Sequence, residues 1–400
     1  MACHDKPTDS TPPRALLLDT VGAGYYATCG LGLSGTAYCW GDGKLGQLGV
    51  SPTDSLFEDC SSIPGEDPCA SSPLPVAGTG MFTGLAVGGA HACAIPAPGQ
   101  PVCWGDDRFG QLGTPDTAAL CGQPPGPCAR TPVGVPLANV IAISAGDSHT
   151  CVLRVGGNAF CWGYGAYGRL GNGGDTTTAV AVAVTGGITF LAIAAGGSFT
   201  CGIGTDSVAY CWGYNHLGQL GDGTTAAHPS PAPVSTTERF VQIATGTAHA
   251  CAISAQGAGF CWGANIDGQL GTTFPGELCG GVVCSTQPVP VAGQHQFTAI
   301  TLGGSFTCAT SGSDSYCWGA IPGTSPPSPD IPVSFGTGGQ GAGTPFVSVT
   351  AGMNHACGIT TSHEAYCWGT DYHGTLGDGP TDGSGSRPVL VIAPDSTASP

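Results

Sequence analysis

Residues 191–221 read LAIAAGGSFTCGIGTDSVAYCWGYNHLGQLG, and this stretch decides how the chain folds. Apolar residues alternate from Leu191 and lead into Ala-Gly, which is typical of a β-strand that ends in a turn. A second strand is expected around Cys201, and a third carries Cys211 and Trp212 after the turn-forming run Gly-Thr-Asp-Ser. The stretch therefore predicts a strand followed by a β-hairpin with one cysteine on each arm.

The same pattern recurs seven times along the chain. Cys-Trp-Gly accounts for every tryptophan, at spacings of 64, 58, 50, 50, 56 and 50 residues, and these are Trp40, Trp104, Trp162, Trp212, Trp262, Trp318 and Trp368. A Pro-Val pair or a valine-rich run follows each one and predicts a fourth strand, which proline confines to an outer edge because it donates no ladder hydrogen bond. Four short antiparallel strands repeated about every 50 residues predict an all-β, seven-bladed β-propeller over residues 15–392. Residues 1–14 are expected to form a flexible linker and residues 393–400 a tail.

Composition excludes several other classes of protein. Sixty-nine glycines, 33 prolines and only 9% charged residues do not support long helices, whereas 41% hydrophobic residues supply a core. The 26 acidic and 9 basic residues give a net charge of −17, which repels nucleic-acid phosphates and anionic membranes. Because no run of 18 apolar residues is present, we expect no segment of this chain to span a membrane, and the charge predicts no binding of nucleic acid.

The loop after each tryptophan distinguishes this propeller from others of similar period. Gly-Gln-Leu-Gly occurs at residues 46–49, 110–113, 218–221 and 268–271, with variants at 168–171 and 374–377. Trp-Gly, a few variable residues and then Gly-Gln-Leu-Gly resemble the repeats of the regulator of chromosome condensation (RCC) family over nearly the whole chain. The resemblance implies an interaction scaffold, of the bacterial, exported, disulfide-rich type. Repeat six departs from the pattern, because Ile321-Pro322-Gly323 follows Trp318 without this loop, and we expect an irregular blade there.

Twenty of the 21 cysteines form close pairs. Seven pairs lie on hairpin arms, nine or ten residues apart, and three lie in inserted loops. The expected disulfides are Cys29–Cys39, Cys93–Cys103, Cys151–Cys161, Cys201–Cys211, Cys251–Cys261, Cys308–Cys317, Cys357–Cys367, Cys60–Cys69, Cys121–Cys128 and Cys279–Cys284. Such bonds persist in an oxidising compartment. The alternative is a set of reduced pairs or scattered zinc sites, which the lack of a second pair nearby in sequence disfavours.

The remaining cysteine, Cys3, precedes a polar stretch from His4 to Arg14. It resembles the lipidated first cysteine of a bacterial lipoprotein whose signal peptide has been removed, and the alternative is a stray thiol. We therefore expect an exported protein of the cell envelope or the extracellular space. A more specific form of this expectation is an outer-membrane lipoprotein that contacts the membrane only through a lipid on Cys3.

The recurring tryptophans and histidines favour structural roles. One tryptophan per blade at a fixed strand position suits packing between neighbouring blades. Histidine two residues before a hairpin cysteine occurs in only four repeats, at His91, His149, His249 and His355. Alanine or phenylalanine holds this position elsewhere, so hydrogen bonding or packing is favoured over a metal site. Catalytic motifs such as Gly-x-Ser-x-Gly and His-Glu-x-x-His are absent from the sequence, and we expect no catalytic residue, metal or cofactor.

Side chains vary most between Trp-Gly and Gly-Gln-Leu-Gly. Equivalent loops of a propeller emerge on one face, so these side chains are expected to form one broad patch. The candidates are Arg108, Phe109, Tyr164, Tyr167, Tyr214, His216, Tyr372 and His373, and the same loops also contain Asp107, Asn215, Asn265, Asp267 and Asp371. Tyrosine and arginine on a rigid scaffold suit recognition of a protein or a glycan, and the alternative is a set of solubilising turn residues.

Three functions compete. The first is a non-enzymatic, extracytoplasmic propeller, expected to be a monomer, that binds a protein or glycan through these loops. The second is a guanine-nucleotide exchange factor for a small GTPase, like the member that named the family, but it needs a reducing compartment and basic nucleosome contacts. The third is an extracytoplasmic hydrolase, which needs a carboxylate cluster at the central channel.

Overall fold

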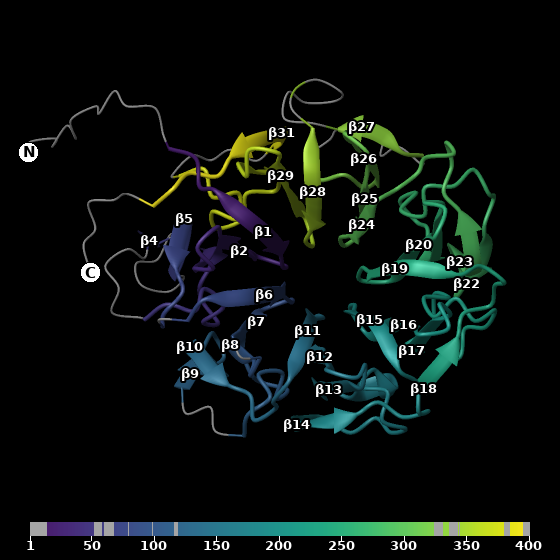
Figure 1. Cartoon of the computed structure of the whole chain (residues 1–400), viewed down its shortest axis with the longest axis horizontal. Helices are drawn as coiled ribbons and strands as arrows, with labels where there is room; N and C mark the ends of the chain where they lie inside the picture. Colours follow the sequence, from purple (N-terminus) through teal and green to yellow (C-terminus); the bar gives the residue numbers. More distant parts are fainter. Residues whose placement is uncertain are drawn as a thin grey trace, which may run out of the picture.

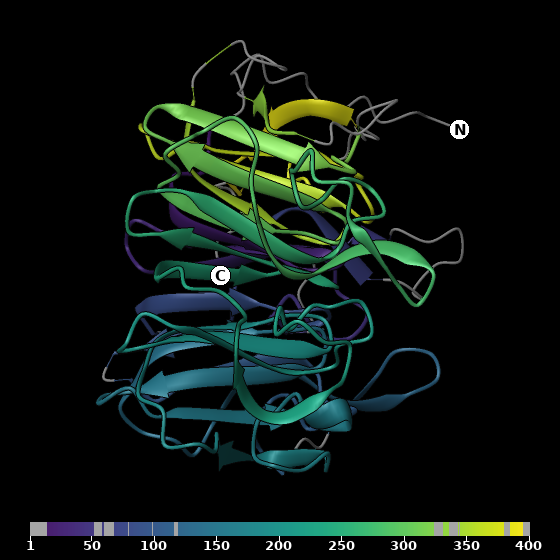
Figure 2. The same ribbon diagram turned by 90° about the vertical axis from the view of Figure 1, so that its right-hand side faces the viewer.

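The computed structural model describes residues 14–51, 58–59, 68–78, 80–97, 99–115, 119–323, 331–335, 343, 345–379 and 385–394. Seven antiparallel sheets surround a central axis (Figure 1). Seen from the side, the turns that join the strands gather at two opposite faces of the ring (Figure 2). The predicted seven-bladed propeller is confirmed.

Each blade contains four strands in chain order, from the axis outward. The inner strands are β1 (Leu18–Ala23), β6 (Phe82–Val87), β11 (Val140–Ala145), β15 (Phe190–Ala195), β19 (Phe240–Thr245), β24 (Ala299–Leu302) and β28 (Phe346–Ala351). The second strands are β2 (Ala27–Gly32), β7 (His91–Pro96), β12 (His149–Arg154), β16 (Phe199–Gly204), β20 (His249–Ser254), β25 (Phe306–Ser311) and β29 (His355–Thr360).

The third strands carry the tryptophans, and the fourth strands form the outer edge. The third strands are β3 (Ala37–Asp42), β8 (Val102–Asp106), β13 (Ala159–Gly163), β17 (Ala209–Gly213), β21 (Gly259–Ala264), β26 (Asp314–Gly319) and β30 (Ala365–Gly369). The fourth are β5 (Pro68–Pro75), β10 (Gly126–Gly134), β14 (Thr178–Ala183), β18 (His228–Pro233), β23 (Val282–Pro290), β27 (Val333–Phe335) and β31 (Gly385–Leu390). The insertions add a short fifth strand to blades one, two and five, which are β4 (Glu58–Asp59), β9 (Ala119–Cys121) and β22 (Glu277–Cys279). One 3₁₀ turn, η1 (Ala166–Gly168), interrupts the strands of the described residues.

Nine disulfide bonds join pairs of cysteines among the residues that the structure describes. The hairpin cysteines face each other directly across the second and third strands, with Cα atoms 4.1 Å apart in the Cys201–Cys211 pair. Bonds join Cys29–Cys39, Cys93–Cys103, Cys151–Cys161, Cys201–Cys211, Cys251–Cys261, Cys308–Cys317, Cys357–Cys367, Cys121–Cys128 and Cys279–Cys284. Cys69 is disulfide-bonded, whereas Cys3 and Cys60, its predicted partner, lie outside the described residues. This many disulfides indicates an oxidising environment.

Each tryptophan is buried between its own blade and the preceding one. Its Nε1 donates to the carbonyl of the residue in the glutamine position of the preceding blade's post-Trp loop, as Trp262 does to Gln219 at 3.0 Å. The same bond joins Trp40 to Thr375, Trp104 to Gln47, Trp162 to Gln111, Trp212 to Arg169 and Trp318 to Gln269. Blade six lacks this loop, and Trp368 Nε1 has no hydrogen-bond partner among the described residues. Packing against Phe335 and Phe346, with ring centroids 4.8 and 5.4 Å away, holds the Trp368 ring instead.

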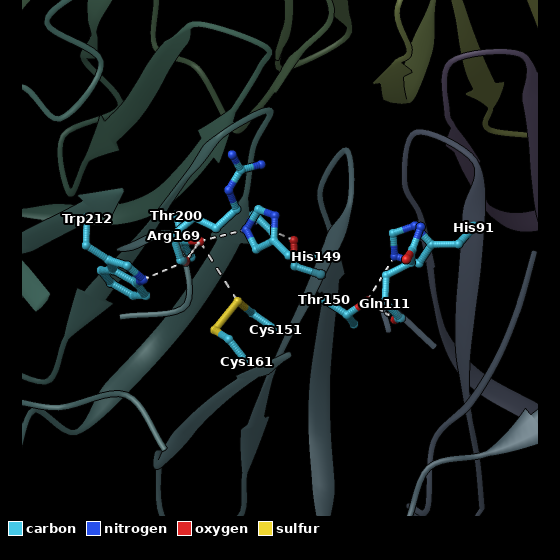
Figure 3. Close-up of a disulfide and its surroundings, with 11 residues drawn as sticks. His91, Gln111, His149, Thr150, Cys151, Cys161, Arg169, Thr200 and Trp212 are labelled. Atoms are coloured by element: carbon cyan, nitrogen blue, oxygen red, sulfur yellow. Dashed lines mark hydrogen bonds between the residues drawn. A yellow bond between two sulfur atoms is a disulfide. The ribbon is translucent and has the colours of Figure 1, made fainter. Parts of the chain in front are cut away.

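Four of the seven blade junctions carry a buried histidine–threonine pair. His149 Nε2 lies 2.8 Å from Thr200 Oγ1, which in turn donates to the Arg169 carbonyl at 2.9 Å (Figure 3). Since the threonine proton is used on the carbonyl, Nε2–H of the histidine is the donor in the pair. The same pairs are His91–Thr150, His249–Thr307 and His355–Thr28. The predicted hydrogen-bonding role of these histidines is confirmed.

A ring of backbone hydrogen bonds closes around the axis. We call the turn between the first and second strands of each blade the inner turn. The amide of the residue after its first glycine donates to a carbonyl of the next blade, as Gly197 N does to Gly246 O at 3.1 Å. The other bonds run from Tyr25 to Gly89, Gly89 to Gly146, Asp147 to Gly196, Thr247 to Gly303, Gly304 to Gly352 and Met353 to Gly24. The last of them joins blade seven to blade one. Away from this ring of bonds, Leu16 N donates to Val391 O at 3.0 Å. The N-terminal segment therefore binds blade seven, which contains the last strand of the chain.

Candidate binding face

One face of the ring collects the segments that vary between repeats. The inner turn of each blade and its post-Trp loop emerge on the same side, because the first amide of the loop donates back to that turn. Examples are Asp42 N to Tyr26 O at 2.7 Å and Tyr164 N to Ser148 O at 2.8 Å. We call the surface made by the inner turns and the post-Trp loops the loop face. All eight predicted binding residues lie on it.

Two side chains shape the post-Trp loops of blades two, four and five. The glutamine Oε1 accepts from the amide two residues earlier, as Gln219 does from Leu217 at 2.8 Å. The first polar residue of the loop accepts from the amide of the buried leucine, as Asn215 does from Leu220 at 2.9 Å. Gly221 has a φ of +67°, and a Cβ there would lie 2.7 Å from Trp262 of the next blade. The sequence therefore predicts correctly what glycine, leucine and glutamine do here.

Several loop residues that the sequence places in the patch serve this scaffold instead. Asn215 is fully buried, and its Nδ2 donates to Asp222 and to the Thr224 and Ala226 carbonyls. Asp107, also buried, accepts from the Leu112 amide at 3.0 Å. Asn265 and Asp371 make the equivalent bonds in their loops. Asn215 and Asp107 thus lie beneath the patch, whereas Asn265 and Asp371 are half-buried and also hold the loop backbone.

Loops without the glutamine adopt a different backbone. Arg169 and Thr375 replace it in blades three and seven, and the residue two positions before each is left-handed, with φ of 64° at Tyr167 and 58° at His373. In the loops that keep glutamine, its Oε1 binds that residue's amide and the residue is not left-handed. A left-handed conformation costs an L-residue about 1–2 kcal/mol. Two of the eight predicted binding residues are thus held in unfavourable conformations.

Aromatic side chains pair across three blade junctions of the loop face. Phe109 of blade two and Tyr164 of blade three have ring centroids 4.4 Å apart. Tyr167 of blade three and Tyr214 of blade four are 4.6 Å apart. Tyr372 of blade seven lies 5.5 Å from Tyr26 of blade one, a residue that the sequence reasoning missed. The exposed fractions of Phe109, Tyr26, Tyr167 and Tyr372 are 37%, 41%, 54% and 54%, so these pairs form a broad, solvent-facing aromatic surface.

The remaining predicted residues touch the insertions or a residue of their own loop. Arg108 pairs with Asp106 at 3.4 Å and donates to the Pro124 carbonyl at 3.2 Å, which ties its loop to the β9–β10 hairpin. His216 lies against Gly280 of the β22–β23 hairpin, where a Cβ would collide with its Nε2. His373 packs on Tyr372, with ring centroids 4.7 Å apart.

Large and small residues alternate around the axis at the centre of the loop face. The residue after the first glycine of each inner turn is, from blade one to blade seven, Tyr25, Gly89, Asp147, Gly197, Thr247, Gly304 and Met353. Their turns line a cavity of about 90 Å³ on the axis. Each large side chain has glycine on at least one side, so four of them fit where seven would not. The cavity is smaller than the roughly 300 Å³ at which small-molecule pockets begin.

The axial side chains form a polar cluster with Arg169. Burial, and then the charge of Asp147 and a hydrogen bond to it, raises the pKa of Tyr25. Burial also raises the pKa of Asp147, against the opposing effects of the Tyr25 hydroxyl and the Arg169 guanidinium. Burial lowers the pKa of Arg169, and Asp147 opposes this. Arg169 is only 3% exposed, donates to Gly197 O at 3.1 Å and lies 4.6 Å from the Tyr164 ring centroid.

Family models match the repeats directly. One, described as the regulator of chromosome condensation (RCC1) repeat, matches residues 34–95, 103–153 and 206–253. A second of the same description matches residues 19–47, 140–169, 190–219 and 346–375, and the two together cover more than half of the chain. The chain belongs to the regulator of chromosome condensation (RCC1) repeat family.

Curated relatives match part of this RCC1 propeller. Human probable E3 ubiquitin-protein ligase HERC4 is 31% identical over 153 residues, which are 38% of this chain and 13% of HERC4. The ultraviolet-B receptor UVR8 of Arabidopsis thaliana is 30% identical over 151 residues, 37% of this chain and 30% of UVR8. The matches thus span less than a third of either relative.

Solved structures share the fold along nearly the full chain. Human WBSCR16 gives a TM-score of 0.76 at 19% identity, over 90% of this chain and 94% of that one. Yeast RCC1 (Prp20), bound to Kap60 in its crystal structure, gives 0.74 at 19% identity, over 98% and 91%. At this identity the likeness shows the fold alone.

Two places in the described part of this RCC1 chain bear on the hydrolase and metal alternatives. Asp147 is the only carboxylate among the described residues that line the axial cavity, so the converging carboxylates of the hydrolase hypothesis are not found there. Glu277, Cys279 and Cys284 lie close enough to hold a metal, but the two cysteines are bonded to each other. No helix in the described ranges is long and apolar enough to cross a membrane.

The axial cluster is what sequence reasoning missed. Arg169 stands where four other repeats have glutamine, and Tyr25, Asp147, Thr247 and Met353 stand where the remaining repeats have glycine. Those departures from the RCC1 repeat were the available signal. They could not be interpreted in advance, because the residues meet only when blades far apart in sequence surround one axis.

Proposed function

We propose that this RCC1 propeller is a non-enzymatic, extracytoplasmic scaffold that binds a partner protein through the loop face. The observation that carries the proposal is the set of exposed aromatic pairs at three junctions of one face. Tyrosine contributes large, rigid contact area, and interfaces are enriched in it. The strained backbones of Tyr167 and His373 add support, because such strain concentrates at functional sites.

The breadth of the surface favours a protein over a glycan or a small ligand. The aromatic pairs occupy junctions 7/1, 2/3 and 3/4, and the axial cavity between them is about 90 Å³. A glycan site is concave and local, whereas a standard protein interface buries about 800 Å² on each partner. The alternative of a GTPase regulator draws on yeast RCC1, whose crystal structure was described together with its binding to Gsp1p and histones. The disulfides and the net charge of −17 disfavour it.

The double substitution Tyr167→Ala/Tyr214→Ala tests the loop face. It removes the exposed pair at junction 3/4, and we expect at least tenfold weaker capture of a partner from envelope extract at an unchanged melting temperature. Tyr210→Ala is the control, because Tyr210 bonds Asp206 at the opposite face. Equal capture by the double variant and the wild type would reject the loop face as the binding surface. Anchoring through Cys3 stays a prediction, tested by acyl mass on that residue.

A further inference from the structure

Tyrosine rings at two junctions of the loop face are partly accessible to solvent. Tyr167 is 54% exposed and pairs with Tyr214, and Tyr372 is 54% exposed and pairs with Tyr26. The face of an aromatic ring is the negative part of its quadrupole and attracts a cation within about 6 Å of the ring centroid. Two separate blade junctions, 7/1 and 3/4, therefore offer open sites of the kind that stack on a cationic side chain.

One tyrosine of this face already holds a guanidinium. The Arg169 Cζ atom lies 4.6 Å from the Tyr164 ring centroid, and its Nε and Nη1 donate to the Ala166 and Gly197 carbonyls at 3.1 Å. A planar guanidinium stacks on an aromatic ring and still donates hydrogen bonds at its edge. The Arg169–Tyr164 contact is thus an internal example of what the open rings at the other junctions can accept.

The charges of the chain indicate the sign of the charge that a partner of the loop face carries. The arginines of the post-Trp loops are engaged within the chain, since Arg169 is buried and Arg108 bonds Asp106 and the Pro124 carbonyl. Asp42 lies 3.9 Å from His373, next to the Tyr26–Tyr372 pair. With a net charge of −17, the chain repels an acidic partner and attracts a basic one.

We propose that the loop face binds a basic, arginine-bearing segment of a partner protein, whose guanidinium groups stack on the tyrosines at junctions 3/4 and 7/1. The proposal rests on the proposed function of the loop face and names the chemistry of its partner. Arginine fits better than lysine, because its planar cation stacks on rings and its hydration shell is weaker.

Calorimetric titration of the intact, oxidised chain with octa-arginine, octa-lysine and octa-glutamate tests this directly. We expect octa-arginine to bind more tightly than octa-lysine and octa-glutamate not to bind. Tyr167→Leu/Tyr214→Leu should weaken octa-arginine binding about tenfold, because leucine keeps apolar contact but has no ring face. Tyr167→Phe/Tyr214→Phe keeps the rings and should retain the affinity. Tyr210→Leu, at the opposite face, should also retain it.

Three results would overturn the proposal of a basic partner segment. Equal octa-arginine affinity in the leucine variant and the wild type would mean that net charge alone attracts the peptide. Octa-lysine binding as tightly as octa-arginine would exclude guanidinium stacking. Capture of the native partner that is lost in Tyr167→Ala/Tyr214→Ala but persists unchanged in 500 mM NaCl would leave the loop-face function standing and reject a basic segment.

Discussion

At the scale of single residues, two positions that meet across each blade junction vary together from blade to blade. The residue two positions before a hairpin cysteine matches the residue one position before the hairpin cysteine of the next blade. Histidine always pairs with threonine, whereas Phe199 packs in one core with Ala250 of the next blade. Phe306 with Ala356, and Ala27 with Ala92, follow the same rule. A histidine without its threonine would leave a buried donor unsatisfied, which costs about 1–3 kcal/mol.

The buried histidines predict a loss of stability in acid. Burial lowers the pKa to about 4 at His91 and His355 and to about 3 at His249. The folded chain therefore keeps them neutral while the unfolded chain protonates them below pH 6.5. Stability is fully present above pH 6.5 and falls as the pH drops toward 4, by up to about 1.4 kcal/mol per pH unit for each histidine. Unfolding midpoints measured in denaturant from pH 8 to 4 check this.

His249→Phe/Thr307→Ala is the matched variant, because it reproduces the Phe199–Ala250 junction. At pH 7 we expect each single substitution to cost about 1–3 kcal/mol and the double to cost less than their sum. Below pH 6.5 the free energy of unfolding should fall more slowly in the double variant than in the wild type, because the variant has one buried histidine fewer to protonate on unfolding. The raised pKa values of Asp106 and Asp147 increase stability as the pH falls, which opposes the effect of the histidines. This contribution is the same in the wild type and the double variant, so it cancels in their comparison. A stability that is flat from pH 7 to 4 would contradict the prediction.

At the scale of the element, the post-Trp loop depends on its own side chains. Gln47, Gln111, Gln219 and Gln269 each accept from the amide two residues earlier, and each loop's backbone carbonyl then receives the next tryptophan. Where the glutamine is missing, the chain turns left-handed at Tyr167 and His373. One glutamine thus separates a relaxed loop from a strained one, and the strained loops carry exposed aromatics.

Gln219→Leu isolates this effect with little change of volume. Gln219 is buried, and its Oε1 is 2.8 Å from the Leu217 amide. We expect a loss of about 1–2 kcal/mol in the free energy of unfolding, because a partly buried amide loses its acceptor. Hydrogen exchange of the Leu217 amide should accelerate at least tenfold. Slow exchange at Leu217 in this variant would show that the glutamine does not hold the loop.

At the scale of the whole molecule, the junctions of the ring are unequal. Junction 6/7 lacks both the histidine–threonine pair and the tryptophan bond, since Trp368 Nε1 has no partner in the described ranges. Junction 4/5 also lacks the pair but keeps the bond from Trp262 to Gln219. Local opening begins where the fewest interactions must break.

We therefore expect the ring to open first between blades six and seven. The Gly304 amide, which donates to Gly352 across this junction at 3.2 Å, should exchange faster than the Gly197 amide, which donates to Gly246 across junction 4/5 at 3.1 Å. Native-state hydrogen exchange with the disulfides intact measures both. Equal exchange at the two glycines would mean that aromatic packing around Trp368 fully replaces the missing bonds.

The fold could be predicted because its determinants are local and repeated. Each hairpin places its cysteines opposite one another, and Trp212 with Gly218 and Gly221 recurs at a fixed offset, so one repeat is enough to define a blade. The departure of repeat six was visible in the same way, and the structure shows its consequence at Trp368. That all eight candidate binding residues lie on one face could be predicted for the same reason, because equivalent loops of a propeller share one side.

The sequence by itself determined seven blades, their disulfide-bonded hairpins, and the face from which the variable loops emerge. Only the tertiary structure decided which of those loop residues are surface and which are scaffold: Asn215 is buried and Tyr167 is exposed, although both lie in equivalent loops. It also brought Tyr25, Asp147 and Arg169 together. The physical reason is that strand periodicity and turn chemistry act within about 50 residues, whereas contacts between blades join residues whose separation the repeat does not encode.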